Sequence, residues 1–214
     1  PGVIIVNRSG RRFANEATTY RDFVPAMLAQ RANQADAGAF IVIDHAALRS
    51  YGLGPIAPRP IPLGRHIASG YLRRGATIAE LAPQLGIDPQ QLEATVARYN
   101  GPASDGKDPD FGKGDSAYDR GNGDPSAKPA PNVRPLGPGP FYAVEIHPGD
   151  LGTFVGLALD PGARVLHPGG APIPGLFAAG NVAVNLTGGN YPAAGLTIGA
   201  AMTFGYLAGR GVKV

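Results

Sequence analysis

The stretch GGNYPAAGLTIGAAMTFGYLAG, residues 188–209, places a phenol, Tyr191, just before a long apolar segment. Glycines such as Gly195 let a backbone approach another group closely. The free N–H groups at the start of a helix attract an anion or a polarised carbonyl. The segment is apolar all round, which predicts a helix that is buried on all sides. Two interpretations are equally good: a helix end that faces a flat, electron-accepting cofactor, or an ordinary buried C-terminal helix behind a flexible loop.

A second group of polar residues lies in NRSGRRFANEATTYRDF, residues 7–23. It contains a basic pair, then Asn15-Glu16, then the run Tyr20-Arg21-Asp22 at the expected start of a helix. These residue types could belong to a site. Spacing alone favours the simpler interpretation, a capped helix start whose charges lie in solvent.

Several kinds of chemistry are excluded by what the sequence lacks. It has no G-x-G-x-x-G dinucleotide fingerprint, no P-loop and no G-x-S-x-G nucleophile elbow. It has no cysteine, which excludes disulfides, thiolate metal sites and a cysteine nucleophile. The 4 histidines stand far apart without metal-ligand spacing, so we expect no metal site. The absence of cysteine is compatible with a reducing cytoplasm, where we expect the protein.

The composition is that of a globular protein, with 43% hydrophobic and 16% charged residues. The net charge of +3 comes from scattered basic residues, so we expect no nucleic-acid partner. No apolar window reaches the roughly 18 residues of a membrane span.

Hydrophobic periodicity and capping residues predict the elements that must position these groups. Thr77 with Glu80 forms a capping box, and Asp88 caps a helix that begins at Pro89 and ends at Asn100-Gly101. We expect strands at 3–6, 39–44, 140–146 and 152–160, and a further strand that begins at 176 and ends at Gly180-Asn181. We expect a hairpin over 162–175 and helices at 22–33, 78–86, 89–101 and 197–207.

Residues 101–140 break this pattern, since they contain 8 glycines and 8 prolines. A stretch of this length without regular structure is unusual inside a domain. It is either a linker or a loop that wraps a site.

Three stretches resemble one flavoprotein superfamily. The sequence GLFAAGNVA…GGNYPAAGLTIGAAMTFGYLAG, within residues 175–209, resembles the C-terminal end of FAD-dependent fumarate reductases and 3-ketosteroid dehydrogenases. IIVNRSGRRFANE, residues 4–16, is similar to the start of their substrate domain. Residues 110–153 look much like the 3-ketosteroid Δ1-dehydrogenase branch. The resemblance covers essentially the whole chain.

This resemblance implies an α+β fold in two parts. In the superfamily a substrate domain is inserted into an FAD-binding domain. Residues 1–145 would be the substrate domain, and residues 146–214 would be the returning C-terminal segment of the FAD-binding domain. The N-terminal FAD part, with its phosphate loop, has no counterpart here. We therefore expect a piece of a longer protein that alone holds FAD poorly and is inactive.

The resemblance also implies which residues would hold FAD. Gly180 and Asn181 would approach the ribityl and pyrophosphate region. The helix start at Leu196, Thr197 and Ile198 would face the C2 carbonyl of the flavin. The helix dipole would then stabilise negative charge on the reduced ring.

The catalytic residues follow from two motifs of the 3-ketosteroid dehydrogenases. Tyr-Pro-x-x-Gly is matched from Tyr191 to Gly195. The Tyr191 hydroxyl and the Gly195 N–H would bind the ketone oxygen. Tyr20 follows Asn-Glu at the family's spacing and would remove the proton from C2, while the C1 hydride goes to flavin N5. The substrate implied is a small-molecule ketone, a 3-ketosteroid.

Rival interpretations remain at both motifs. The histidines and the arginine with which fumarate reductases bind a dicarboxylate are absent from GDLGT and GNYPAAG, which disfavours a small acid as substrate. The family's Gly-Pro-Gly is AAG at 193–195, and its basic residue is Phe154, so the ketone could differ from a standard steroid. NEATTYRD also resembles a fumarate reductase motif in which Arg21 would carry the proton, but we favour Tyr20. A non-catalytic binding module is the third interpretation.

Overall fold

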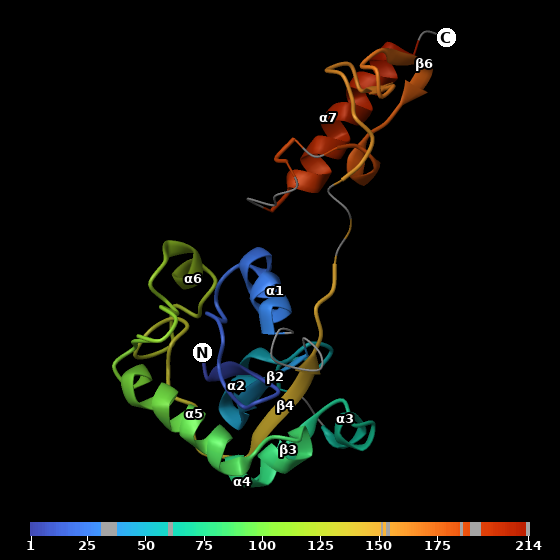
Figure 1. The fold of residues 1–214 in the computed structure, drawn as a ribbon. Coiled ribbons are helices and arrows are strands. Elements are labelled where there is room, and N and C mark those ends of the chain that lie inside the picture. Colours follow the sequence, from blue (N-terminus) through green and yellow to red (C-terminus); the bar gives the residue numbers. More distant parts are fainter. Residues whose placement is uncertain are drawn as a thin grey trace. The chain divides into compact units, whose positions relative to one another are not determined.

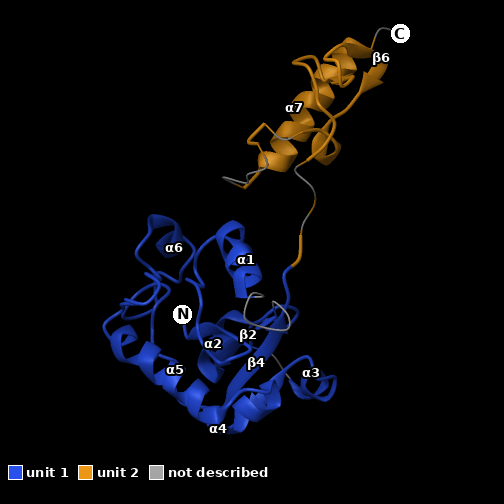
Figure 2. Cartoon of the chain, in the orientation of Figure 1, with its two compact units in different colours: residues 1–148 blue, residues 149–214 orange. Residues whose placement is uncertain are grey.

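The chain folds into a mixture of helices and strands, as a computed structural model shows (Figure 1). The structure describes residues 1–30, 38–59, 62–150, 152, 155–184, 186–188 and 194–212. These divide into two units, residues 1–148 and 149–214 (Figure 2).

Unit 1 is built on an antiparallel sheet with the order β1-β2-β4-β3. Val42 of β2 pairs with Ile4 of β1 on one side and with Ala143 of β4 on the other. The elements of this unit are β1 (Val3–Asn7), α1 (Tyr20–Ala29), β2 (Ala39–Asp44), α2 (His45–Tyr51), α3 (Gly64–Ala68), β3 (Arg73–Gly75), α4 (Ile78–Leu81), η2 (Ala82–Leu85), α5 (Pro89–Ala103), α6 (Ala117–Gly121) and β4 (Phe141–Ile146).

Both faces of this sheet are buried, because successive side chains of a strand point to opposite faces. One face, including Ile4, Val6 and Phe40, packs against α4, η2 and α5. The other face, including Ile43 and Tyr142, packs against α2 and Leu72. The α5 helix contributes Leu92, Val96, Tyr99 and Ala103, whose spacing gives a single apolar stripe.

The helix caps match the sequence expectations at their starts. Asp88 Oδ1 accepts the Gln90 N–H at 3.0 Å, and Thr77 Oγ1 accepts the Glu80 N–H at 3.1 Å. The Glu80 carboxylate accepts the Ala76 N–H, one residue before the position that a capping box requires.

The predicted end of α5 at Asn100-Gly101 is wrong, since the helix continues to Ala103. The Asn100 side chain does not stop the helix, because both ends of its amide bond the backbone of Leu136. The predicted helix over 22–33 begins at Tyr20, and its last residues lie outside the described part of the chain.

Of the two structures expected for residues 101–140, the linker is wrong, because residues 104–140 pack onto unit 1. Apart from α6 this segment lacks regular elements, yet it buries Val133 and Leu136 in the core of unit 1. Its order depends strongly on buried polar groups. Arg134, for example, donates to both oxygens of Asp44, a fully buried carboxylate that also caps α2 and accepts the Gly137 N–H.

Unit 2 contains the predicted hairpin, formed by β5 (Arg164–Leu166) and β6 (Pro172–Phe177). The predicted strand over 152–160 is wrong in its described part, which forms only single bridges through Leu157 and Leu159. The predicted strand from 176 is also wrong, because its first residues end β6 and the 3-10 helix η3 (Gly180–Val182) follows.

Helix α7 (Leu196–Gly211) closes the described chain, close to its predicted span. The prediction that this helix is buried on all sides is wrong, since Ile198, Met202 and Tyr206 are 64%, 70% and 66% exposed. Inside unit 2 it packs against η3 near Gly180 and against Phe177 near its end. None of the described helices is long and apolar enough to cross a membrane.

Candidate functional site

Four buried charges lie together where the chain leaves β1 and approaches α1. The side chains of Arg12, Glu16, Asp108 and Lys113 are 2–4% exposed. Arg12 donates from Nε to Glu16 Oε1 at 2.6 Å and from Nη1 to Asp108 Oδ1 at 2.7 Å. Lys113 Nζ lies 3.4 Å from Glu16 Oε2. The solvated charge cluster expected from spacing is therefore wrong for these residues, since the two cations and two carboxylates neutralise each other inside the fold.

Burial and pairing oppose each other in setting the ionisation of this cluster. Burial alone would raise the pKa of Glu16, but the charge of Lys113 and the hydrogen bond and charge of Arg12 outweigh it, so that the pKa lies below its ordinary value. Burial disfavours the Arg12 cation, but hydrogen bonds to Asp108 and Glu16 raise the pKa of Arg12 above its ordinary value. Glu16 and Arg12 are thus held in their charged forms at neutral pH.

Aromatic rings enclose the Arg12 guanidinium, whose Cζ lies 4.7 Å from the Tyr99 ring centroid and 5.0 Å from that of Phe111. Lys113 Nζ also faces the Tyr99 ring, at 5.4 Å. The Tyr99 hydroxyl is buried and has no hydrogen-bond partner in the described structure. Burial and the nearby Glu16 carboxylate raise the pKa of Tyr99, so that its hydroxyl stays neutral.

The cluster also fixes the turn that leads to α1. Glu16 Oε1 accepts the Ile5 N–H of β1 at 3.2 Å, and Lys113 Nζ donates to the Val3 carbonyl at 2.7 Å. Next to it, Asn15 donates to Asp119 Oδ2 at 2.8 Å and accepts the Ala17 N–H. The backbone that precedes the candidate proton carrier is therefore held by β1 and by the 104–140 segment together.

Tyr20, predicted as the proton carrier, is the first residue of α1, and its side chain is 50% exposed. Arg21 follows it and is also exposed. Successive residues of an α-helix point about 100° apart around the axis. The two rival proton carriers therefore face different directions from the same helix turn.

The predicted cofactor residues lie in unit 2. Gly180 and Asn181 of η3 line one small cavity together with Thr197 of α7, while Leu196 and Ile198 flank Thr197 in the first helix turn. Gly195 is the N-cap with φ +87°, and without a side chain it cannot cap the first N–H groups of α7. The N–H groups at a helix start are suited to bind an electron-rich group.

The structure does not bring the three predicted catalytic residues together in one described unit. Tyr191 lies outside the described residues. Tyr20 belongs to unit 1 and Gly195 to unit 2. The described residues contain no group of three or more His, Asp or Glu side chains that could hold a metal.

Sequence reasoning missed Asp108, Lys113 and Asp119, which complete the cluster and its neighbour. All three lie in the segment that was recognised only as glycine- and proline-rich. The segment carries both charged and apolar residues, and this mixture was the one sequence signal that it packs onto the fold.

Comparison with known proteins identifies relatives over almost the whole chain. Residues 1–198 match the model of the FAD binding domain family. A 4-oxocyclohex-2-ene-1-carboxylate 5-dehydrogenase of Sinomonas cyclohexanicum is 45% identical over 99% of this chain, and a 3-oxosteroid 1-dehydrogenase of Mycobacterium tuberculosis is 42% identical over 97%. A crystal structure of 3-ketosteroid Δ1-dehydrogenase from Sterolibacterium denitrificans, in complex with 1,4-androstadiene-3,17-dione, is 40% identical and superposes over 99% of the chain with a TM-score of 0.91. The chain spans 36–38% of the length of these proteins.

The buried cluster makes stability depend on pH. Because the folded pKa of Glu16 lies below its ordinary value of 4.5, its contribution is present above that value and is lost as the pH falls through the folded pKa. Glu16→Gln should lower the free energy of unfolding by about 3–5 kcal/mol near neutral pH, since Arg12 and Lys113 lose a buried partner. This loss of stability should shrink in acid, where Glu16 itself becomes protonated.

Urea unfolding of both proteins from neutral pH to below 4.5 measures the loss, with the exposed Glu93→Gln as control. A deficit independent of pH would contradict the assignment.

The unpaired Tyr99 hydroxyl gives a second test. Tyr99→Phe keeps the ring over Arg12 and removes a buried polar group without a partner, so the free energy of unfolding should stay unchanged or rise by about 1 kcal/mol. Tyr99→Leu loses the ring and should lower it by about 1–3 kcal/mol. Urea unfolding of both variants measures the difference. A clear loss in Tyr99→Phe would show that the hydroxyl has a partner, such as a water.

Proposed function

This chain belongs to the FAD binding domain family, and we propose that it contributes the substrate domain and the last FAD-binding segment to a flavin-dependent dehydrogenase. Unit 1 would be the substrate domain and unit 2 the FAD-binding segment. The reaction would desaturate a cyclic ketone beside its carbonyl. The observation that carries this proposal is the 45% identity, over 99% of the chain, to a dehydrogenase of a cyclic ketone.

The residues of unit 2 fit an FAD that binds there. The N-cap Gly195 supplies no side-chain cap to the start of α7, and the positive end of a helix dipole suits the electron-rich carbonyl edge of a flavin. Gly180, with φ +73°, and Asn181 share a cavity with Thr197, so that backbone and hydroxyl groups converge. When bound, FAD would supply the acceptor for a hydride from the substrate.

The chain's own residues would perform the acid–base and binding steps. The Tyr20 oxygen would accept the proton from the carbon next to the ketone, as the bond between that carbon and its neighbour becomes double. The Tyr191 hydroxyl and the Gly195 N–H would donate hydrogen bonds to the ketone oxygen, where negative charge develops. Arg12 and Glu16 would act indirectly, by holding the turn before Tyr20.

Two ketones are candidates for the substrate. A 3-ketosteroid follows from the motifs Tyr191 to Gly195 and Asn15 to Tyr20 and from similarity to the mycobacterial enzyme. A 4-oxocyclohexene carboxylate is the second candidate, because the Sinomonas relative is slightly more similar. The AAG sequence at 193–195 and Phe154 also depart from the steroid-enzyme pattern.

We expect flavin-dependent desaturation in the longest product of the gene that carries this chain. The product and the 214-residue chain are each mixed with FAD, an artificial electron acceptor and either androst-4-ene-3,17-dione or 4-oxocyclohex-2-ene-1-carboxylate. Dye reduction and product mass measure turnover, and the preferred ketone identifies the substrate class. The 214-residue chain alone is expected to be inactive. Flavin binding without turnover of either ketone, or no flavin binding, would refute the proposed function.

Single substitutions in the active product separate the roles. Tyr191→Phe should lower kcat about 10²- to 10³-fold, the cost of losing one oxyanion donor, with unchanged FAD content. Tyr20→Phe should stop deuterium exchange at the carbon next to the ketone, which mass spectrometry measures. Arg21→Gln is the matched control and should leave that exchange intact. The opposite result, exchange lost only in the Arg21 variant, would assign the proton transfer to Arg21.

A further inference from the structure

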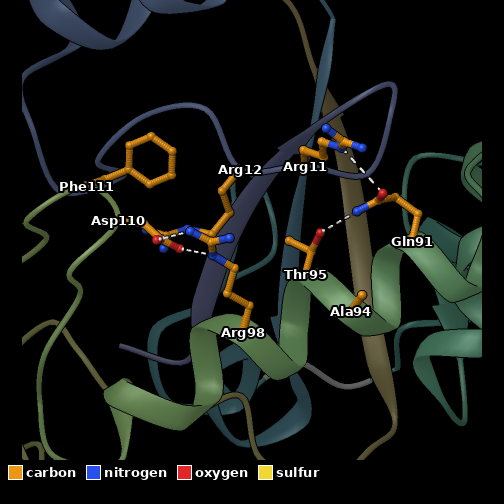
Figure 3. Close-up of a pocket in the computed structure, with 8 residues that line it drawn as sticks. All are labelled: Arg11, Arg12, Gln91, Ala94, Thr95, Arg98, Asp110 and Phe111. Carbon is orange, nitrogen blue, oxygen red and sulfur yellow. Dashed lines mark hydrogen bonds and ion pairs between the residues drawn. The ribbon is translucent and has the colours of Figure 1, made fainter.

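A cavity in unit 1 is lined by none of the residues assigned above to the ketone or FAD. It has a volume of about 510 Å³ and lies between the turn after β1, helix α5 and Phe111 (Figure 3). Sites for small molecules range from about 300 to 1,000 Å³. Three of its lining residues are arginines, whereas Asp110 is the one acidic residue among them. Figure 3 shows the lining side chains, which come from the turn, from α5 and from the segment that follows α5.

Neighbouring groups already compensate two of the three arginines. Arg12 is neutralised by the buried carboxylates of the cluster described above. Arg98 donates from Nε and Nη2 to the two oxygens of Asp110 at 2.8 and 2.6 Å. Within the described structure Arg11 bonds no carboxylate, so it leaves one uncompensated positive charge in the cavity.

A chain of hydrogen bonds orients Arg11 without neutralising it. Arg11 Nε donates to Gln91 Oε1 at 3.4 Å, Gln91 Nε2 donates to Thr95 Oγ1 at 3.1 Å, and Thr95 Oγ1 donates to the Gly10 carbonyl at 2.6 Å. The bond through Nε leaves both Nη groups of Arg11 as donors. Side chains held before a ligand arrives reduce the entropy lost on binding.

The remaining wall is apolar. The Phe111 ring lies against the Arg12 guanidinium, and Ala94 lines the same space from α5. A ligand that fills this volume therefore needs more than a charge. It needs an anionic group for Arg11 and a flat apolar body for Phe111.

We infer that this cavity binds a small organic anion, with a carboxylate or phosphate group on the Nη groups of Arg11 and an apolar ring against Phe111 and Ala94. Guanidinium groups bind both kinds of anion in a bidentate manner. None of the residues that line this cavity is assigned to the ketone or to FAD, so the inference does not depend on the proposed function.

The test is isothermal titration of the 214-residue chain with four probes: benzoate, phenyl phosphate, inorganic phosphate and benzyl alcohol. Arg11→Gln is compared with Arg65→Gln, which removes an exposed arginine from α3 outside the cavity. Both variants change exposed side chains, and thermal unfolding checks that they stay folded. We expect benzoate or phenyl phosphate to bind, and Arg11→Gln to weaken that binding about tenfold or more, while Arg65→Gln leaves it unchanged.

Each result decides the inference. Tighter binding of benzoate or of phenyl phosphate identifies the class of anion. Binding of benzyl alcohol as tight as that of the anions would overturn the role of Arg11, and binding of inorganic phosphate as tight as that of phenyl phosphate would overturn the role of Phe111. Equal affinities in the two variants, or no saturable binding at millimolar concentrations, would overturn the site itself.

Discussion

Charge balance around Arg12 is the constraint on which much of unit 1 depends. Two cations and two carboxylates lie inside the fold with little access to water, so each needs the others. Their partners come from the turn after β1 and from the 104–140 segment, and the cluster also bonds the backbone of β1 at Val3 and Ile5. The sheet, the start of α1 and the 104–140 segment are therefore joined at one point, and a chain that misplaces any one of them leaves a charge buried without a partner.

The same principle explains how a segment with few regular elements can be ordered. Residues 104–140 form backbone hydrogen bonds within turns but hardly any helix or sheet, so polar side chains supply bonds that tie the segment to its surroundings. Asp44 is the clearest case, because it accepts from Ala47, from Gly137 and from both Nη groups of Arg134. Asn100 does the same for Leu136. The loop thus depends on a few buried acceptors that belong to the regular elements beneath it.

Local patterns in the sequence predict the local structure well. The apolar runs at β1, β2 and β4 and the caps Thr77 and Asp88 were all found from short-range signals. The buried pairs could not be found in this way, since Arg12 and Asp108 lie 96 residues apart and charge alone does not reveal burial. Helix α7 fails for a related reason, because an apolar sequence predicts burial only where the described chain supplies a covering surface. For the site, motif resemblance named Tyr20, Gly180, Asn181 and Thr197, whereas the supporting charges came only from the structure.

The order of strands in unit 1 has a mechanical consequence. The chain passes into unit 2 from β4, which is not an edge strand but pairs with β2 on one side and β3 on the other. A strand with a neighbour on each side must lose two hydrogen-bonded ladders before it leaves the sheet, whereas an edge strand must lose only one. The connection to unit 2 therefore starts from an interior strand, the most firmly held kind of position in a sheet.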